Sequence, residues 1–296
     1  MRTIGHLSRL PDERPGIGAP PRLAALRQAV AQAVGAGTWR TDPPAREMKL
    51  GGTRALAFAP HGTAKATLVH FHGGGYGLGA PEMAGPYAAA LAERCGVEVI
   101  CPQYRLAPDY PLPAGLNDGL KVVEALRDAG CGQLILSGDS AGGGLAASLT
   151  ALCVADGIKV AGLVLLSAWL DLTVSSDCYD ANAASDPLFS RASAQDSSGL
   201  YLQGWPADDP LASPLFANLA GFPPTLVSAG AGEVLFEDSR RFHAALEAAG
   251  VPAELSVIPD MEHTAVIRDK SLVGAAETFD IVARFIDRLL ADRSSR

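Results

Sequence analysis

A serine flanked by small residues, in the run GDSAGG at 138–143, is the first candidate nucleophile of this chain. An apolar stretch at 133–137 precedes the run and a small-residue stretch at 142–155 follows it, which predicts a strand, a sharp turn and a helix. Such a turn strains the serine backbone, and only glycine-sized neighbours let the strand and helix approach closely enough. The pattern therefore predicts that Ser140 is a nucleophile.

The same glycines permit a second interpretation, because residues 142–147 have the GxGxxA spacing of dinucleotide-binding loops. Such loops require an acidic partner about 20 positions further on, and no convincing one follows here. The loop also comes late in the chain. The nucleophile is the better interpretation.

A second motif, HGGGY at 72–76, directly follows the apolar residues 67–71. Alone it would indicate a tight turn with a capping histidine. Acyl transfer, however, develops negative charge on an oxygen that backbone N–H groups stabilise, and glycines let the main chain come close to it. Together with the serine motif, it predicts an oxyanion hole formed by the N–H groups of Gly73, Gly74 and Ala141.

A serine nucleophile needs a base, and only two of the six histidines, His243 and His263, follow Ser140. His243 lies within a predicted helix at 238–249, whereas His263 lies in a loop after a predicted strand, so His263 is the expected base. Glu233 is the first carboxylate after the preceding strand. We expect it to accept the ring N–H of His263 and fix its tautomer.

Other carboxylates fit the role of the acid less well. Asp139 is expected to point away beside the nucleophile, and Asp118 and Asp171 follow other strands. Glu237 and Asp238 are expected to begin the next helix as N-terminal charges.

Composition excludes several other classes of function. The 296 residues carry 24 basic and 32 acidic side chains, a net charge of −8, which argues against nucleic acid or an anionic membrane as partner. No stretch indicates a signal peptide or a membrane span, so a soluble, cytoplasmic protein is expected. The five cysteines are odd in number and form no CxxC pair, and we expect neither a metal nor a cofactor.

The elements that must position these residues alternate between strands and helices. Most of the strand candidates are continuously apolar, as in a mostly parallel sheet covered by helices on both faces. The candidates are strands at 67–71, 97–101, 133–137, 162–166, 225–228 and 254–258, and helices at 85–95, 115–129, 142–155, 238–249 and 277–291.

Two regions interrupt this alternation within the single domain, 1–296, that we predict. One is a proline-rich lead-in, 1–45, with an amphipathic stretch at 23–34. The other, 175–221, is longer than plain connections are. Both are expected to form a cap over the strand ends, where open α/β sheets bind ligands.

With these motifs, the sequence resembles the bacterial hormone-sensitive-lipase-like esterases of the α/β-hydrolase fold. The resemblance runs from about residue 65 to the C-terminus and includes YRLAP at 104–108 and AWLDLT at 168–173. It implies an eight-stranded, mostly parallel sheet with a helical cap, and a serine-dependent carboxylesterase that acts on short- to medium-chain acyl esters without cofactor or metal. It also suggests a homodimer.

Two departures from the family pattern bear on the site. Glu233 stands where the family usually has aspartate, which is one methylene shorter. The run Asp260-Met261-Glu262-His263-Thr264 stands in place of the common Gly-Met-x-His-Gly, and we expect its two extra carboxylates to raise the pKa of His263.

The expected chemistry is acylation of Ser140 followed by hydrolysis of the acyl-enzyme. A lactone hydrolase would use the same triad, a small amidase fits less well, and a non-hydrolytic ligand receptor is disfavoured because His263 is present. Large aromatic side chains are candidates for the pocket wall, although they are core residues as often: Tyr76, Trp169, Phe189, Tyr201 and Trp205.

Overall fold

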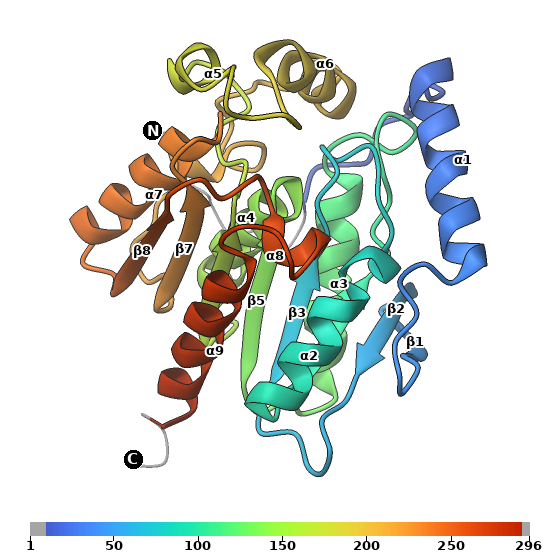
Figure 1. The fold of residues 1–296 in the computed structure, drawn as a ribbon, viewed down its shortest axis with the longest axis vertical. Helices are drawn as coiled ribbons and strands as arrows, with labels where there is room; N and C mark the ends of the chain where they lie inside the picture. Colours follow the sequence, from blue (N-terminus) through green and yellow to red (C-terminus); the bar gives the residue numbers. More distant parts are fainter. Residues whose placement is uncertain (1–9, 292–296) are drawn as a thin grey trace.

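The structure, a computed structural model, describes residues 10–291 and is built on an eight-stranded sheet of order β1-β2-β4-β3-β5-β6-β7-β8 (Figure 1). β2 pairs antiparallel with both β1 and β4, and all other neighbours are parallel. The predicted fold class is thereby confirmed. The strands are β1 (Arg46–Leu50), β2 (Thr53–Phe58), β3 (Thr67–Phe71), β4 (Glu98–Pro102), β5 (Leu134–Asp139), β6 (Gly162–Leu166), β7 (Thr225–Gly230) and β8 (Ala253–Ile258).

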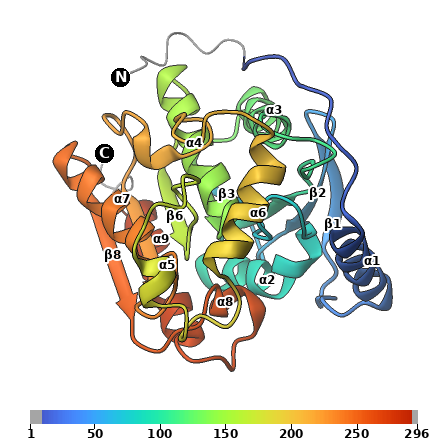
Figure 2. The ribbon, with the colours of Figure 1, turned by 90° about the horizontal axis from the view of Figure 1, so that it is seen from above.

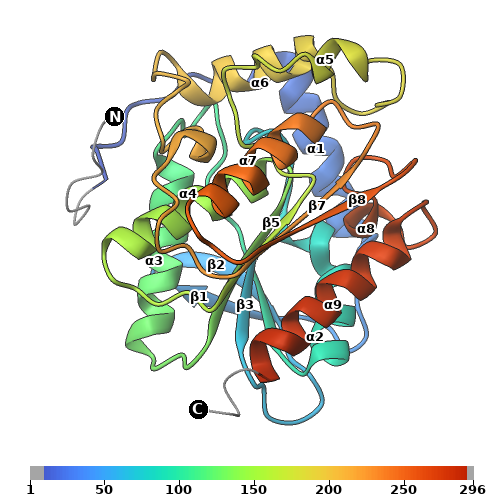
Figure 3. The same cartoon turned by 90° about the vertical axis from the view of Figure 1, so that its left-hand side faces the viewer.

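Helices cover both faces of the sheet. Figure 3 shows one layer, α2 (Gly85–Cys95) and α9 (Ala275–Ala291), on the opposite face from α3 (Ala114–Asp128), α4 (Ala141–Ala155) and α7 (Phe236–Ala248). The core accordingly has two halves. On β3, Leu68 packs in the half beneath α2 and α9, while Val69 and Phe71 pack in the half beneath α3 and α4. Burial on both faces explains why the strand is apolar at successive positions.

The sequence did not reveal the β1–β2 hairpin. Its strands meet at the two-residue turn Gly51-Gly52, and both glycines have positive φ, +55° and +88°. A glycine pair in a two-residue hairpin turn is a usable sequence pattern. The strand pattern of β1 is weak because three of its five residues, Arg46, Glu47 and Lys49, are charged and only Leu50 is buried.

The segment 175–221, called the insertion below, contains α5 (Cys178–Ala181), α6 (Arg191–Leu202) and the short 3₁₀ helix η2 (Pro214–Phe216). Figures 1 and 2 show α5 and α6 lying above one end of the sheet. That end carries the carboxyl termini of the parallel strands, since the insertion contacts residues in the loops that follow β3 and β8.

The lead-in forms α1 (Pro21–Ala36), and residues 1–9 of the predicted cap lie outside the described part. The predicted amphipathic stretch is helical, but none of the α1 residues is buried, so the expected apolar stripe does not pack into a core. Arg27 attaches the helix instead. Its guanidinium donates to the carbonyl of Gly77 (2.8 Å) and is paired with Asp109.

Within residues 10–291, no helix is long and apolar enough to cross a membrane, and no group of three or more His, Cys, Asp or Glu side chains is arranged to hold a metal ion. All five cysteines are free thiols.

Candidate active site

Ser140 occupies a single-residue turn between β5, which ends at Asp139, and α4, which begins at Ala141. Its φ of 52° and ψ of −124° are strained for a residue with a side chain. A Cβ added to Gly138 would collide with the backbone of Gly142, and one added to Gly142 would collide with the carbonyl of Phe71 on β3. The two glycines therefore permit the close contact that raises Ser140 on the turn.

Three predicted residues from distant parts of the chain form one hydrogen-bonded row. His263 Nε2 lies 3.0 Å from Ser140 Oγ, and His263 Nδ1 lies 2.7 Å from Glu233 Oε2. With Nδ1–H donating to the carboxylate, Nε2 is free to accept the serine proton. Ser140 and His263 are each 7% exposed and Glu233 is 1% exposed, so the row is shielded from bulk water.

The other oxygen of Glu233 is held as firmly. Oε1 accepts the hydroxyl of Ser167 at 2.8 Å and the backbone N–H of Gly230. Ser167 directly follows β6, and its Oγ also accepts the N–H of Thr264 at 3.1 Å, one residue beyond His263. Ser167 therefore links the loop of the acid to the loop of the histidine.

Opposing effects set the pKa of His263. Burial lowers it, but the hydrogen bond and charge of Glu233, together with the charges of Asp186 and Asp139, more than offset burial and raise the pKa. The expectation that Asp260 and Glu262 would do this needs correction. Asp260 is exposed to solvent, and Glu262 is paired with Arg268 at 2.8 Å.

The HGGG turn, residues 72–75, faces the serine, but one of its predicted donors is already engaged. Gly73 N–H donates to Asp139 Oδ1 at 3.0 Å, so it is not free to bind an oxyanion. The N–H groups of Gly74, Gly75 and Ala141 have no acceptor among the described residues. The expectation of Gly73 as an oxyanion donor is therefore corrected, and the candidate donors are Gly74, Gly75 and Ala141.

The residues before and beside the nucleophile support this turn. Asp139, expected to point away, accepts the Gly73 N–H and also lies 3.1 Å from His70 Nε2. His72 Nδ1–H donates to the carbonyl of Gly73 at 2.7 Å, and burial lowers the pKa of His72 despite this bond and the nearby charge of Asp139. His72 is therefore a neutral brace for the turn.

Four of the five predicted pocket aromatics form a continuous cluster. Tyr76 stacks on Tyr201 with centroids 3.8 Å apart, Trp169 contacts both Tyr76 and Phe189, and the Phe189 ring lies nearly parallel to His263 at 6.1 Å. Phe189 and Tyr201 belong to the insertion. Trp205 lies apart from these rings, beneath the guanidinium of Arg14 at 5.2 Å.

The first turn of α7 contains Glu237 and Asp238, as predicted, but Asp238 does more than begin the helix. It is fully buried, and its Oδ2 accepts the N–H groups of Leu170 and Asp171 at 2.9 and 3.0 Å. Burial raises its pKa to about 7, with Asp171 adding to the rise, while these bonds and Arg241 oppose it.

The other downstream histidine, His243, lies on α7 and is 3.6 Å from Glu247. Sequence reasoning missed Ser167 and Asp186 as supports of the site. The position of Ser167 at the carboxyl end of a parallel strand was a usable indication, whereas Asp186 lies in an irregular segment with no such pattern.

Comparison with known proteins agrees with this geometry. Residues 68–267 match the family described as having the alpha/beta hydrolase fold. The chain is 35% identical to an acetyl-hydrolase of Streptomyces hygroscopicus over 75% of each chain, and 34% identical to an esterase of Acinetobacter venetianus over 73% of each.

Solved structures point the same way. A crystal structure of the protein EstE5 superposes with a TM-score of 0.86 at 29% identity, covering 96% of this chain and 95% of that one. An esterase from the bacterial hormone-sensitive lipase family superposes with a TM-score of 0.84 at 28% identity, covering 93% and 100%. The chain therefore belongs to the α/β-hydrolase family, among the hormone-sensitive-lipase-like esterases.

Proposed function

We propose that this carboxylic ester hydrolase acts on short- to medium-chain acyl esters through an acyl-enzyme formed on Ser140. The observation that carries the proposal is the hydrogen-bonded row from Ser140 Oγ through His263 to Glu233, at 3.0 and 2.7 Å. In this order the imidazole can act as the base that activates the serine hydroxyl as a nucleophile, and the carboxylate stabilises the positive charge that the imidazole then carries. The esterase and acetyl-hydrolase relatives support the same reaction.

The reaction proceeds in two halves. Ser140 Oγ attacks the ester carbonyl while His263 Nε2 takes the hydroxyl proton, and Glu233 stabilises the imidazolium. Collapse of the tetrahedral intermediate breaks the bond to the alcohol, which leaves with the proton from His263. Water then attacks the acyl-enzyme and gives a proton to His263, and Ser140 recovers that proton as the carboxylic acid departs.

The N–H groups of Gly74, Gly75 and Ala141 stabilise the oxyanion in both halves. They have no acceptor within residues 10–291, and Gly74 is exposed, which leaves this side of the site open to a small-molecule substrate. We further propose that the insertion caps the site, with Tyr76, Trp169, Phe189 and Tyr201 as its aromatic wall.

The test is hydrolysis of a p-nitrophenyl ester series from acetate to laurate, with a γ-lactone alongside. Wild type should prefer short acyl chains, and Ser140→Ala and His263→Ala should each lower kcat by about a thousandfold or more. His243→Ala is the matched control and should keep wild-type activity. A preference for the lactone would be consistent with the proposed mechanism but would assign a different substrate class. Full activity of folded Ser140→Ala would refute the mechanism.

A further inference from the structure

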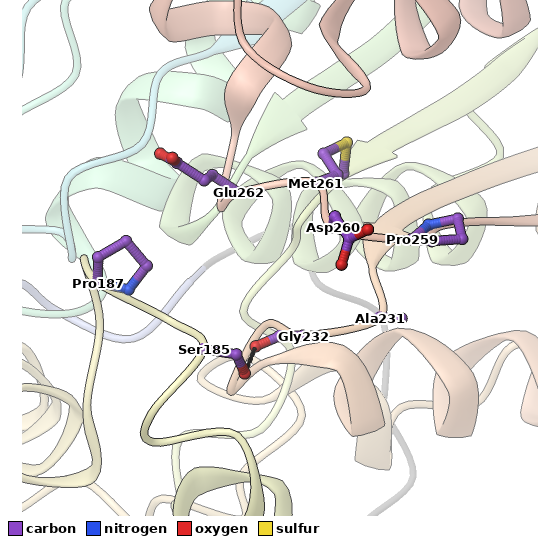
Figure 4. Close-up of a pocket in the computed structure, with 8 residues that line it drawn as sticks. All are labelled: Ser185, Pro187, Ala231, Gly232, Pro259, Asp260, Met261 and Glu262. Atoms are coloured by element: carbon purple, nitrogen blue, oxygen red, sulfur yellow. Dashed lines mark hydrogen bonds between the residues drawn. The ribbon is translucent and has the colours of Figure 1, made fainter.

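Two side chains of the insertion hold the loop that carries Glu233, residues 230–234, called the acid loop below. Asn182 Nδ2 donates to the carbonyls of Ala231 and Glu233 at 3.1 and 2.8 Å. Ser185 Oγ donates to the carbonyl of Gly232 at 2.8 Å, the dashed line in Figure 4. The insertion therefore fixes the main chain of the acid loop.

Asp186 adds a third anchor that carries a negative charge. Its Oδ2 accepts the N–H of Val234 at 3.0 Å, at the end of the acid loop. Its Oδ1 accepts the N–H groups of Leu188 and Phe189, both at 3.0 Å, and the carboxylate is only 7% exposed. One buried carboxylate thus joins the acid loop to Phe189, the residue whose ring lies against His263.

Asp186 lies next to a pocket between the insertion and the loops that carry Glu233 and His263. Residues on both sides of it, Ser185 and Pro187, line a pocket of about 470 Å³ together with the acid loop and residues 259–262, which precede His263 (Figure 4). The insertion leaves this space unfilled. Beside this pocket, the insertion is attached to the acid loop by the few hydrogen bonds described above. Among them, those of Asp186 have a carboxylate as acceptor and are therefore charge-assisted.

We propose that Asp186 is a positioning residue for ester hydrolysis, which holds Glu233 and Phe189 in place around His263 and stabilises the imidazolium by its charge. This inference rests on the proposed function. A carboxylate that accepts three backbone N–H groups is fixed in position, and in a site shielded from water its charge acts strongly on a neighbouring cation.

Charged groups face His263 from several elements packed against it. Three are carboxylates: Glu233 of the acid loop, Asp186 of the insertion and Asp139 at the end of β5. The fourth is Arg268 of α8 (Ala265–Arg268), whose Nη1 lies 3.4 Å from the His263 carbonyl and is paired with Glu262. The three carboxylates favour the protonated imidazole. Removing the Asp186 charge should lower the pKa of His263 and extend activity to lower pH.

The test compares Asp186→Asn with wild type in the full chain, with p-nitrophenyl acetate as substrate and kcat/KM measured against pH. The expected result is a fall in kcat of about tenfold. The acidic limb of the pH profile, where kcat/KM falls as His263 becomes protonated, should move to lower pH by about half a unit. A purely structural role would lower kcat without displacing the limb.

Two matched variants separate position from charge. Asn182→Ala removes a neutral anchor of the same loop, so kcat should fall while the acidic limb stays in place. Asp260→Asn removes an exposed carboxylate close to His263 in the sequence and should change neither quantity. Asp186→Glu keeps the charge on a longer stem, so it should lower kcat and retain the wild-type limb.

The proposal is overturned if folded Asp186→Asn has the kcat and acidic limb of wild type, or if Asp260→Asn displaces the limb equally. Circular dichroism checks folding, and if Asp186→Asn does not fold, Asp186→Glu decides, since an unchanged kcat would overturn the proposal. If the proposed function itself were wrong, a different result would show it: the Ser140→Ala variant would still hydrolyse the ester.

Discussion

At the scale of the residue, the carboxylate of Glu233 is held at both oxygens. Oε2 faces His263, while Oε1 accepts Ser167 Oγ and the N–H of Gly230. These two donors fix the longer side chain, which departs from the aspartate that the resemblance led us to expect. The motifs were enough to predict that Ser140, His263 and Glu233 lie together in this order. The position of Ser167 at the end of β6 was a further usable indication, but Asp186 could not be predicted, because it lies in an irregular segment that only folding brings to the site.

Ser167→Ala should lower kcat about tenfold, because Glu233 loses a donor and the acid and histidine loops lose their shared contact. Ser228→Ala is the matched control, since Ser228 is also buried, within the neighbouring strand β7, but its Oγ has no partner in the described structure. Steady-state kinetics on p-nitrophenyl acetate measures both. Equal effects of the two substitutions would show that Ser167 Oγ has no special role.

At the scale of the element, the six parallel strands and five long helices that cover them were predictable, because their apolar patterns are continuous or periodic. Boundaries moved by a few residues, and the polar β1–β2 hairpin was missed. The turn into the oxyanion loop shows another limit of sequence patterns. The HGGG motif identifies three candidate N–H groups, but only the packing of Asp139 beneath the turn reveals that Gly73 is engaged.

The contact between α4 and β3 gives a prediction about stability. Gly142→Ala should lower the free energy of unfolding by about 3 kcal/mol, because the new Cβ would collide with the Phe71 carbonyl. Gly199→Ala is the matched control in α6, where an added Cβ meets no atom within 4 Å, and it should stabilise by about 0.5 kcal/mol. Urea unfolding measures both changes. Similar effects at the two glycines would contradict the described packing.

At the scale of the whole molecule, buried carboxyl groups link α7 to the loop that follows β6. Asp238 is fully buried on α7 and fixes the backbone at Leu170 and Asp171, and Arg241 of the same helix pairs with Asp171 at 2.8 Å. The composition, with its excess of acidic residues, could not show that two carboxylates share one buried site. Their proximity depends on the register of α7 against the loop after β6.

This arrangement makes stability depend on pH. The folded pKa of Asp238, about 7, lies above the ordinary value of 3.8, so between these values the folded state holds a proton that the unfolded state has lost. The contribution of this group to stability therefore falls as pH rises from about 4 to about 7 and is level above that. Asp238→Asn keeps an acceptor for the two N–H groups and removes this dependence.

The stability of Asp238→Asn relative to wild type should therefore increase by about 2 kcal/mol between about pH 5 and about pH 8. Urea unfolding at the two pH values measures the change, and Asp260→Asn, at an exposed carboxylate, is the control. A difference between Asp238→Asn and wild type that stays constant with pH would show that Asp238 is charged in the folded protein throughout this range.

The central claim is that Ser140 forms the covalent intermediate, and its most direct test is the site of labelling by an alkyl p-nitrophenyl phosphonate. Wild type and Ser140→Ala are treated with the reagent, digested and compared by peptide mass spectrometry, while hydrolysis of p-nitrophenyl acetate is followed in parallel. The account predicts one adduct, on the peptide containing Ser140, which forms at the rate at which hydrolysis is lost and is absent from Ser140→Ala. Loss of hydrolysis with the adduct on another residue would contradict it.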